Sequence, residues 1–243
     1  MRRPTLVLTS LVLGVALIAG ACSDDSGDED SSGDASAADT SATPATTGPV
    51  NSTGTTLPAG RGEFEAETVE FSTSDGVLLA GTVFTPDSGS TEGLADGQAA
   101  DGIVLAHMRG ADRSTWKPFA ELAAANGFRV LTFDFRGYGG SEGEPDTLLD
   151  VDLTAAVERL AEEVDTVVVM GASMGGTATV NVASKLDLAG IVSLSAPAQF
   201  QGLPALEVAT EVAEPTMFIA AADDQPYADA ATAMSELTPD LRR

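Results

Sequence analysis

Short apolar runs alternate with segments of helical spacing through the second half of the chain, and this alternation limits the possible folds more than any other feature. The expected strands are 103–108, 129–135, 166–170, 191–194 and 216–220, and the expected helices are 116–126, 150–164, 174–185, 203–212 and 227–237. Strands that alternate with helices predict a parallel sheet covered by helices on both faces. Two earlier segments, 65–71 and 77–84, predict a hairpin turning at Ser74-Asp75-Gly76. We therefore expect an α/β fold with a mostly parallel sheet.

The N-terminus has the pattern of an export signal. Arg2 and Arg3 precede an apolar run over 6–19, and small residues lead up to Cys22. Residues 18–22, Ile-Ala-Gly-Ala-Cys, resemble a bacterial lipobox, in which Cys22 would be lipidated and become the first residue of the mature protein. The alternative is an ordinary secretory signal with an incidental cysteine. The resemblance implies an exported protein, anchored by its N-terminal lipid to the extracytoplasmic face of the cell membrane.

Residues 23–62 differ in amino-acid composition from the rest of the chain. They are Ser, Asp, Thr, Ala, Gly and Pro with few large apolar groups, so we expect a disordered linker. Acidic residues between 28 and 39 match part of a calcium-loop spacing, but the flanks show no helical period, and we expect no calcium site there. The folded domain is expected over 63–243, after the signal at 1–22.

Composition excludes several classes of function. The chain holds one Cys and one His, too few for an internal disulfide or a zinc site built from those residues. Its formal net charge is -25, which repels the phosphates of nucleic acids. We expect no cofactor, no metal and no nucleic-acid partner.

One motif carries chemistry. Residues 171–176 read Gly-Ala-Ser-Met-Gly-Gly, a G-x-S-x-G motif with an expected strand before it and a helix after it. The turn is so tight that Gly171 and Gly175 must be nearly free of side chain, and Ser173 is raised above the sheet at a helix N-terminus. The alternative is a glycine-rich turn with no chemical role, which the strand and helix context disfavours.

Together these segments resemble the α/β-hydrolase superfamily, in particular small lid-less members such as dienelactone hydrolases and serine esterases. Residues 134–141 match the D-x-R-G-x-G-x-S loop of that family, where Arg136 would be a scaffold residue. Residues 107–110, His-Met-Arg-Gly, occupy the place of the H-G-x loop, with Met108 where the family usually has Gly. The resemblance implies that Ser173 is the nucleophile and that the backbone N–H groups of Met174 and Arg109 form the oxyanion hole.

The resemblance also assigns an acid and a structural histidine. The acid would be Asp224, with Asp223 as the close alternative; both could instead be acids that cap a helix N-terminus. His107 would brace the oxyanion loop, close to Ser173, without being the catalytic base. The competing hypothesis makes His107 that base.

The family places its catalytic histidine third in chain order, after an eighth strand. Residues 225–243 contain no histidine, and a helix of about 11–12 residues and a strand of about 5–6 would use nearly all of them. We therefore expect a C-terminally truncated domain lacking the final strand and helix. The expected function is a serine hydrolase of carboxylic esters or related acyl compounds, acting on a small molecule and impaired in this chain. The alternative is a non-catalytic binding domain or an inactive fragment.

Overall fold

The computed structural model describes residues 62–87 and 101–239. The signal with Cys22, the linker up to residue 61, the acidic spacing at 28–39, most of the expected loop at 88–101 and the last four residues lie outside the described residues. The predictions made for those segments are therefore not tested by the structure.

A long antiparallel hairpin opens the described fold, as predicted. Strand β1 (Phe64–Ser72) pairs with β2 (Leu78–Pro86) in a register that runs from Phe64 opposite Pro86 to Ser72 opposite Leu78. At the turn Gly76 has a φ of 86°, which favours a residue without a side chain. Strand β2 then pairs antiparallel with β4 (Arg129–Phe133) and joins the hairpin to the rest of the sheet.

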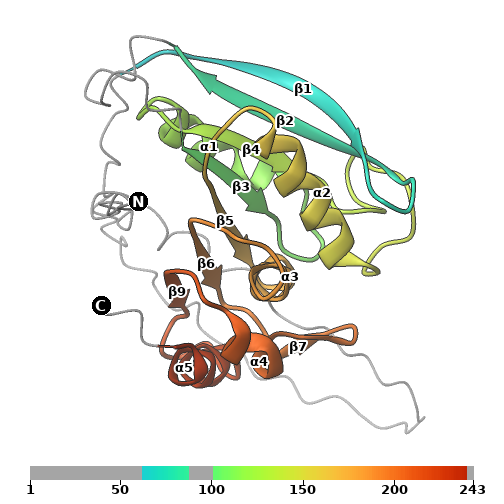
Figure 1. Ribbon diagram of the computed structural model, residues 1–243. Coiled ribbons are helices and arrows are strands. Elements are labelled where there is room, and N and C mark those ends of the chain that lie inside the picture. The colour runs from blue at the N-terminus through green and yellow to red at the C-terminus, as the bar shows by residue number, and fades with distance from the viewer. Residues whose placement is uncertain (1–61, 88–100, 240–243) are drawn as a thin grey trace, which may run out of the picture. The chain divides into compact units, whose positions relative to one another are not determined.

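The remaining strands are parallel to one another and to β4. Together with the hairpin they form one sheet in the order β1-β2-β4-β3-β5-β6-β9 (Figure 1). They are β3 (Gly102–Ala106), β5 (Val167–Ala172), β6 (Gly190–Leu194) and β9 (Thr216–Ile219), beside β4. Every residue of β3, β5 and β6 is buried. Continuous apolar runs of this kind are typical of strands covered on both faces, and the expectation of a mostly parallel α/β sheet is confirmed.

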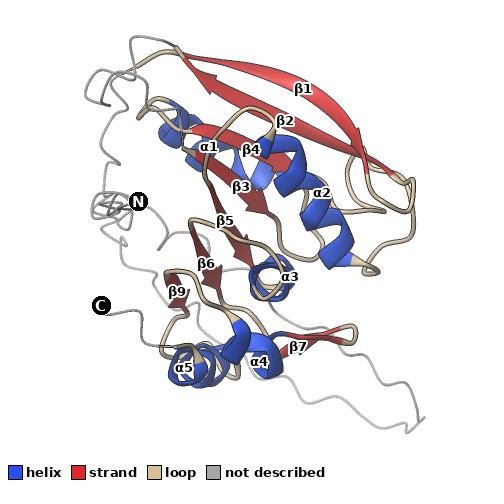
Figure 2. Cartoon of the chain, viewed as in Figure 1, coloured by secondary structure: helices blue, strands red, loops and turns tan. Residues whose placement is uncertain are grey.

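Helices connect the parallel strands, and a further helix follows the last of them (Figure 2). They are α1 (Lys117–Ala124), α2 (Leu149–Ala161), α3 (Met174–Ala183), the short α4 (Ala205–Val208) and α5 (Tyr227–Leu237). The chain moves from β3 to β4 in one direction and from β4 through β5 and β6 to β9 in the other. Right-handed crossovers then put α1 on one face of the sheet and the helices α2, α3 and α4 on the other. Among the described residues no helix is long and apolar enough to span a bilayer.

Helix α3 lies at the centre of the packed layers. All of its residues are buried, and they are Gly, Ala, Thr, Val, Met and Asn. Small side chains let the helix axis approach the strands closely, which brings its N-terminus against the ends of β3 and β5. This close packing fixes the turn between β5 and α3.

One predicted element is wrong in part. The sequence predicted a single helix over 203–212, but residues 199–204 form a two-stranded hairpin of β7 (Gln199–Phe200) and β8 (Leu203–Pro204). Gln201 and Gly202 both have positive φ at its turn. Pro204 disfavours a helical conformation at Leu203 before it and is itself extended, so the helix starts only after it, as the four-residue α4 followed by a 3-10 turn at Ala209–Glu211.

Candidate active site

The loops that carry the predicted site all leave the sheet at one edge. Strands β3, β5, β6 and β9 are parallel, and Ala106 of β3 lies opposite Gly171 of β5. His107, Ser173 and the segment 220–226 therefore follow the carboxyl ends of strands at the same edge. In open parallel sheets this edge is where ligands bind.

Ser173 occupies the turn between β5 and α3, as the sequence predicted. It has φ 49° and ψ −115°, a conformation that a residue with a side chain rarely adopts. Its N–H donates to the carbonyl of Leu194 at 2.8 Å, which ties the turn to the neighbouring strand β6. Such strain persists only where the surroundings impose it, and it is concentrated at functional sites. The side chain is partly exposed while its neighbours on both sides are buried.

The two glycines of the motif are required by close backbone approach. A Cβ on Gly171 would lie 2.5 Å from the hydroxyl of Thr179 and closer still to the carbonyl of Gly175. A Cβ on Gly175 would lie 2.7 Å from the carbonyl oxygen of His107 and closer still to that of Ala106. Neither space admits a methyl group, so the motif spacing follows from the packing of α3 onto β5 and β3.

His107 is fully buried beside this turn, and both of its ring nitrogens are engaged. Nε2 lies 3.0 Å from the backbone N of Phe135, and Nδ1 lies 2.8 Å from the carbonyl oxygen of Met108. An amide N–H can only donate, so Nε2 accepts and the proton sits on Nδ1. The ring packs edge-on against Phe135 and Tyr138, and burial lowers the pKa of His107 below its ordinary value. In this arrangement the neutral imidazole has no free nitrogen to take a proton from Ser173.

The loop after β3 is oriented by that same histidine. The carbonyl of Met108 accepts from His107 Nδ1–H and from the N–H of Ala111 at 3.3 Å. Because the peptide group is planar and trans, fixing this carbonyl fixes the N–H of Arg109 in the opposite direction. Within the described chain the Arg109 amide donates to no protein acceptor. Gly110 follows with φ 74°, a left-handed conformation that glycine adopts easily. Met108 does not have a positive φ, so its position in the turn accepts a side chain.

The second predicted donor is the N–H of Met174. Met174 is the first residue of α3, so its amide has no intrahelical acceptor and carries the positive end of the helix dipole. Its side chain is fully buried, which holds this backbone position in place. Backbone amides of this kind can stabilise a negatively charged oxygen.

The two candidate acids follow β9 on the loop before α5. Asp223 is exposed and Asp224 is partly buried. Helix α5 begins at Tyr227 after Pro226 and has no side-chain cap, so neither carboxylate is the capping group that the alternative hypothesis required. Within residues 62–87 and 101–239, neither side chain accepts a hydrogen bond. The structure brings both acids to the edge that carries Ser173 and leaves the choice between them open.

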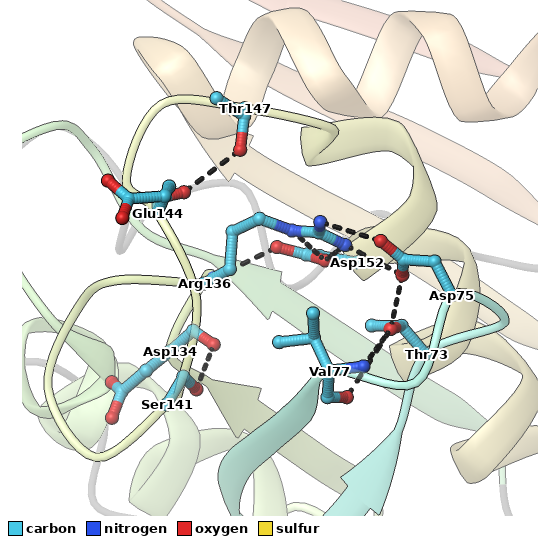
Figure 3. A network of polar contacts seen from close by, with 9 residues as sticks. All are labelled: Thr73, Asp75, Val77, Asp134, Arg136, Ser141, Glu144, Thr147 and Asp152. Atoms are coloured by element: carbon cyan, nitrogen blue, oxygen red, sulfur yellow. Dashed lines mark hydrogen bonds and ion pairs between the residues drawn. The ribbon is translucent and has the colours of Figure 1, made fainter.

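The loop after β4 is held by two buried charged side chains. Asp134 accepts from the N–H of Arg113 at 2.7 Å and from the N–H of Gly140 at 2.8 Å, and Ser141 donates to the Asp134 carbonyl at 2.6 Å. Arg136 is only 4% exposed. Figure 3 shows its guanidinium between two carboxylates, Asp152 of α2 and Asp75 of the β1–β2 turn.

These contacts suit a scaffold role for Arg136. Its Nε lies 2.8 Å from Asp152 Oδ1, and its Nη1 and Nη2 lie 2.9 and 3.0 Å from the two oxygens of Asp75. The guanidinium holds the pKa of Asp75 well below its usual range. Sequence reasoning missed Asp152, although an acid on the apolar face of the predicted helix was a signal that it has a buried partner.

A further ion pair joins the oxyanion loop to the loop before α2. Arg109 donates to Asp146 through Nε at 2.8 Å and Nη2 at 2.8 Å, and the hydroxyl of Tyr138 donates to the other carboxylate oxygen. Burial and the neighbouring carboxylate raise the pKa of Tyr138 to about 12. The guanidinium also lies 6.0 Å from the ring centroid of Phe200 in the β7–β8 hairpin. Neither Asp146 nor Tyr138 was identified from the sequence, because a loop residue gives no periodic signal.

No group of three or more His, Cys, Asp or Glu side chains in the described part of the chain is arranged to hold a metal ion. The groups described at this edge of the sheet include a serine hydroxyl, two backbone amides and carboxylates.

Comparison with known proteins agrees with the fold. The sequence model of the alpha/beta hydrolase family matches residues 103–242. The chain is 32% identical over 152 residues to the uncharacterized protein Rv2307c of Mycobacterium tuberculosis H37Rv, covering 60% of this chain and 49% of that protein. It is 34% identical over 134 residues to the uncharacterized protein YfhR of Escherichia coli K12, covering 53% of this chain and 45% of that protein. The chain thus spans about half the length of the curated relatives it matches.

Among solved structures, the esterase PF2001 of Pyrococcus furiosus superposes with a TM-score of 0.58. The sequence identity is 20%, and the match covers 72% of this chain and 78% of the esterase. At that identity the similarity shows a shared fold, and the activity of this chain has to be argued from its own residues.

Proposed function

The chain belongs to the alpha/beta hydrolase family, and from this premise we propose that it is a serine hydrolase of carboxylic esters or related acyl compounds, with Ser173 as nucleophile. The observation that carries the proposal is the strained turn at Ser173, with φ 49°, imposed by Gly171 and Gly175. A turn with no chemical role would not require a serine with positive φ at the N-terminus of a buried helix.

The proposed reaction has two steps. The Ser173 oxygen attacks the ester carbonyl carbon, forming the Oγ–C bond while the serine proton leaves to a base or to water. The carbonyl oxygen becomes negative and is stabilised by the N–H groups of Arg109 and Met174; the intermediate then collapses and expels the alcohol. Water next attacks the acyl-serine, releasing the carboxylic acid and restoring the serine. Asp224, or Asp223, supplies the carboxylate that the family resemblance assigns to the catalytic triad.

We propose that the 243-residue chain performs this reaction slowly. A serine hydroxyl is a weak nucleophile without an adjacent base, and both nitrogens of the one histidine, His107, are engaged with the backbone. In well-studied serine proteases the loss of one triad member lowers turnover by about 10⁴–10⁶. The same engagement of His107 favours a second candidate, a non-catalytic domain that keeps the acyl-binding site.

The substrate class follows from what surrounds Ser173. Only residues 195–215 separate β6 from β9, and they form the two-residue strands β7 and β8, the short α4 and a 3-10 turn. No cap domain lies in that segment. We therefore propose small or exposed acyl groups rather than long-chain lipids as substrates.

Hydrolysis of nitrophenyl acetate tests the proposal. The wild-type chain should hydrolyse it measurably faster than the uncatalysed rate but far more slowly than an enzyme with a complete triad, and Ser173→Ala should remove most of this excess. Equal rates for wild type and Ser173→Ala would contradict the hydrolase proposal and favour the non-catalytic binding domain. Rapid Ser173-dependent turnover that His107→Ala abolishes would make His107 the base and overturn the account of its ring nitrogens.

We also propose that Cys22 is lipidated and anchors the mature protein to the extracytoplasmic face of the cell membrane. The support is the positive n-region, the apolar run and the small residues before the chain's one cysteine. Detergent partitioning should place wild type in the detergent phase and Cys22→Ala in the aqueous phase. A wild type found wholly in the aqueous phase contradicts this.

A further inference from the structure

The geometry points to Asp146 as a positioning residue for the oxyanion loop: it holds the side chain of Arg109, whose backbone N–H is the proposed oxyanion donor. This inference rests on the proposed function, since it assigns a role within the same site. Asp146 comes from the loop between β4 and α2 and does not belong to the G-x-S-x-G turn or to either motif loop recognised in the sequence.

Both oxygens of the Asp146 carboxylate accept hydrogen bonds. Oδ2 accepts from both Nε and Nη2 of Arg109 at 2.8 Å, and Oδ1 accepts from the hydroxyl of Tyr138. Its side chain is 13% exposed, whereas that of Arg109 is 60% exposed. The mostly covered carboxylate is therefore the fixed member of the pair, and the arginine is the member that it restrains.

Tyr138 anchors the carboxylate to the centre of the site. Its ring packs edge-on against His107, with the centroids 5.1 Å apart, and His107 holds the carbonyl of Met108. The peptide joining Met108 to Arg109 is thus held on both sides. His107 fixes its carbonyl from the buried side, and Asp146 fixes the arginine side chain from the solvent side.

The peptide between Met108 and Arg109 needs to be restrained on both sides because a flexible residue follows it. Gly110 follows Arg109 with φ 74°, and nothing lies within 4 Å of the place where its Cβ would be. The loop can therefore rotate there unless Arg109 is restrained. A misplacement of the donor by about 1 Å can lower a rate by about 10²-fold, and complete loss of one donor costs about 10²–10³.

The position of Asp146 agrees with a specific role. It has φ 61°, a left-handed conformation that Asp and Asn tolerate better than other residues with side chains. Because the Arg109 side chain is 60% exposed, its ion pair with Asp146 contributes little to stability. The two contacts of the carboxylate, with Arg109 and with the Tyr138 hydroxyl, hold the residue in this conformation.

The test compares Asp146→Asn with Asp150→Asn as the matched control. Asp150 makes a similar partly exposed ion pair with Lys185 at 2.7 Å, close in sequence and outside the site. Asn tolerates the backbone conformation at 146 but removes the charge and one acceptor. Asp146→Asn should lower the Ser173-dependent kcat for nitrophenyl acetate about tenfold with KM little changed, since a weakened hold displaces the donor only in part. Asp150→Asn should leave kcat unchanged.

A double-substitution cycle separates positioning from general destabilisation. Arg109→Met keeps the backbone N–H and removes the restrained side chain, so it should lower kcat as Asp146→Asn does. The combined variant should fall no further than either alone. Hydrogen exchange gives a measurement that does not depend on turnover: the amide of Ala111, which donates to the Met108 carbonyl at 3.3 Å, should exchange faster in Asp146→Asn and at the wild-type rate in Asp150→Asn.

The outcomes distinguish a failure of this inference from a failure of the proposed function. No Ser173-dependent turnover in wild type overturns both. Ser173-dependent turnover that Asp146→Asn leaves unchanged overturns the inference alone. Equal losses in Asp146→Asn and Asp150→Asn, additive losses in the cycle, or unchanged exchange of the Ala111 amide also overturn it.

Discussion

The buried His107 should make stability depend on pH in a window where few other groups titrate. Its pKa is lowered in the folded protein because burial disfavours the charged ring. In the unfolded chain the pKa is about 6.5, so below that pH the unfolded state binds a proton that the folded state does not. The contribution is therefore fully present above about pH 6.5 and is lost as pH falls toward the folded pKa.

The magnitude follows from linkage. If the imidazole stays neutral in the fold throughout, lowering the pH from 7.0 to 5.5 reduces the free energy of unfolding by about 1.3 kcal/mol, which is an upper limit. For a domain of this size that corresponds to roughly 3–5 °C in Tm. The full chain contains one histidine, so no second imidazole contributes.

Urea unfolding followed by circular dichroism at pH 7.0, 6.25 and 5.5 measures this change, with His107→Gln as the control. The variant is expected to be less stable at every pH, because it loses the two backbone contacts, but to lack the extra slope. One imidazole proton signal in the NMR spectrum reports the same ionisation directly. A folded-state signal that titrates at about pH 6.5, or identical slopes in wild type and His107→Gln, would refute the reasoning.

Two further predictions concern the scaffold. Gly175→Ala should reduce the free energy of unfolding by about 1–3 kcal/mol in urea, because its Cβ would be forced against the carbonyl of His107, and the Ser173-dependent rate should fall with it; unchanged values would contradict the packing argument. Asp152→Asn should cost about 3 kcal/mol, since it leaves the buried Arg136 partly uncompensated, and Asp75→Asn on the exposed side should cost clearly less; equal losses in urea unfolding would contradict the assignment of Asp152 as the buried partner.

Much of the fold was predictable because its signals are local. Helix α5 matches the predicted 227–237, and the β1–β2 hairpin turns at Ser74-Asp75-Gly76 as expected. The strand and helix on either side of Ser173 were predicted because a buried strand, a tight glycine turn and a small-residue helix leave distinct patterns. These elements depend on residues that are close in sequence.

The features that were missed depend on contacts between distant segments. The β7–β8 hairpin has only two residues in each strand, too few for any periodic pattern. The partners of Arg136 lie 61 residues before it and 16 after it, and those of Arg109 lie in the loop before α2 and in the β7–β8 hairpin. Sequence spacing therefore identified the two arginines but could not identify what holds them.

The central claim is that Ser173 is the nucleophile, and covalent labelling tests it most directly. A fluorophosphonate probe reacts when a serine oxygen bonds to phosphorus and fluoride leaves, and mass spectrometry of the digested chain locates the adduct. The account predicts a slowly formed adduct on Ser173 that disappears in Ser173→Ala, with the neighbouring Ser193 and Ser195 unmodified. No adduct on Ser173 after prolonged reaction, or labelling of another serine at the same rate in wild type and Ser173→Ala, would contradict it.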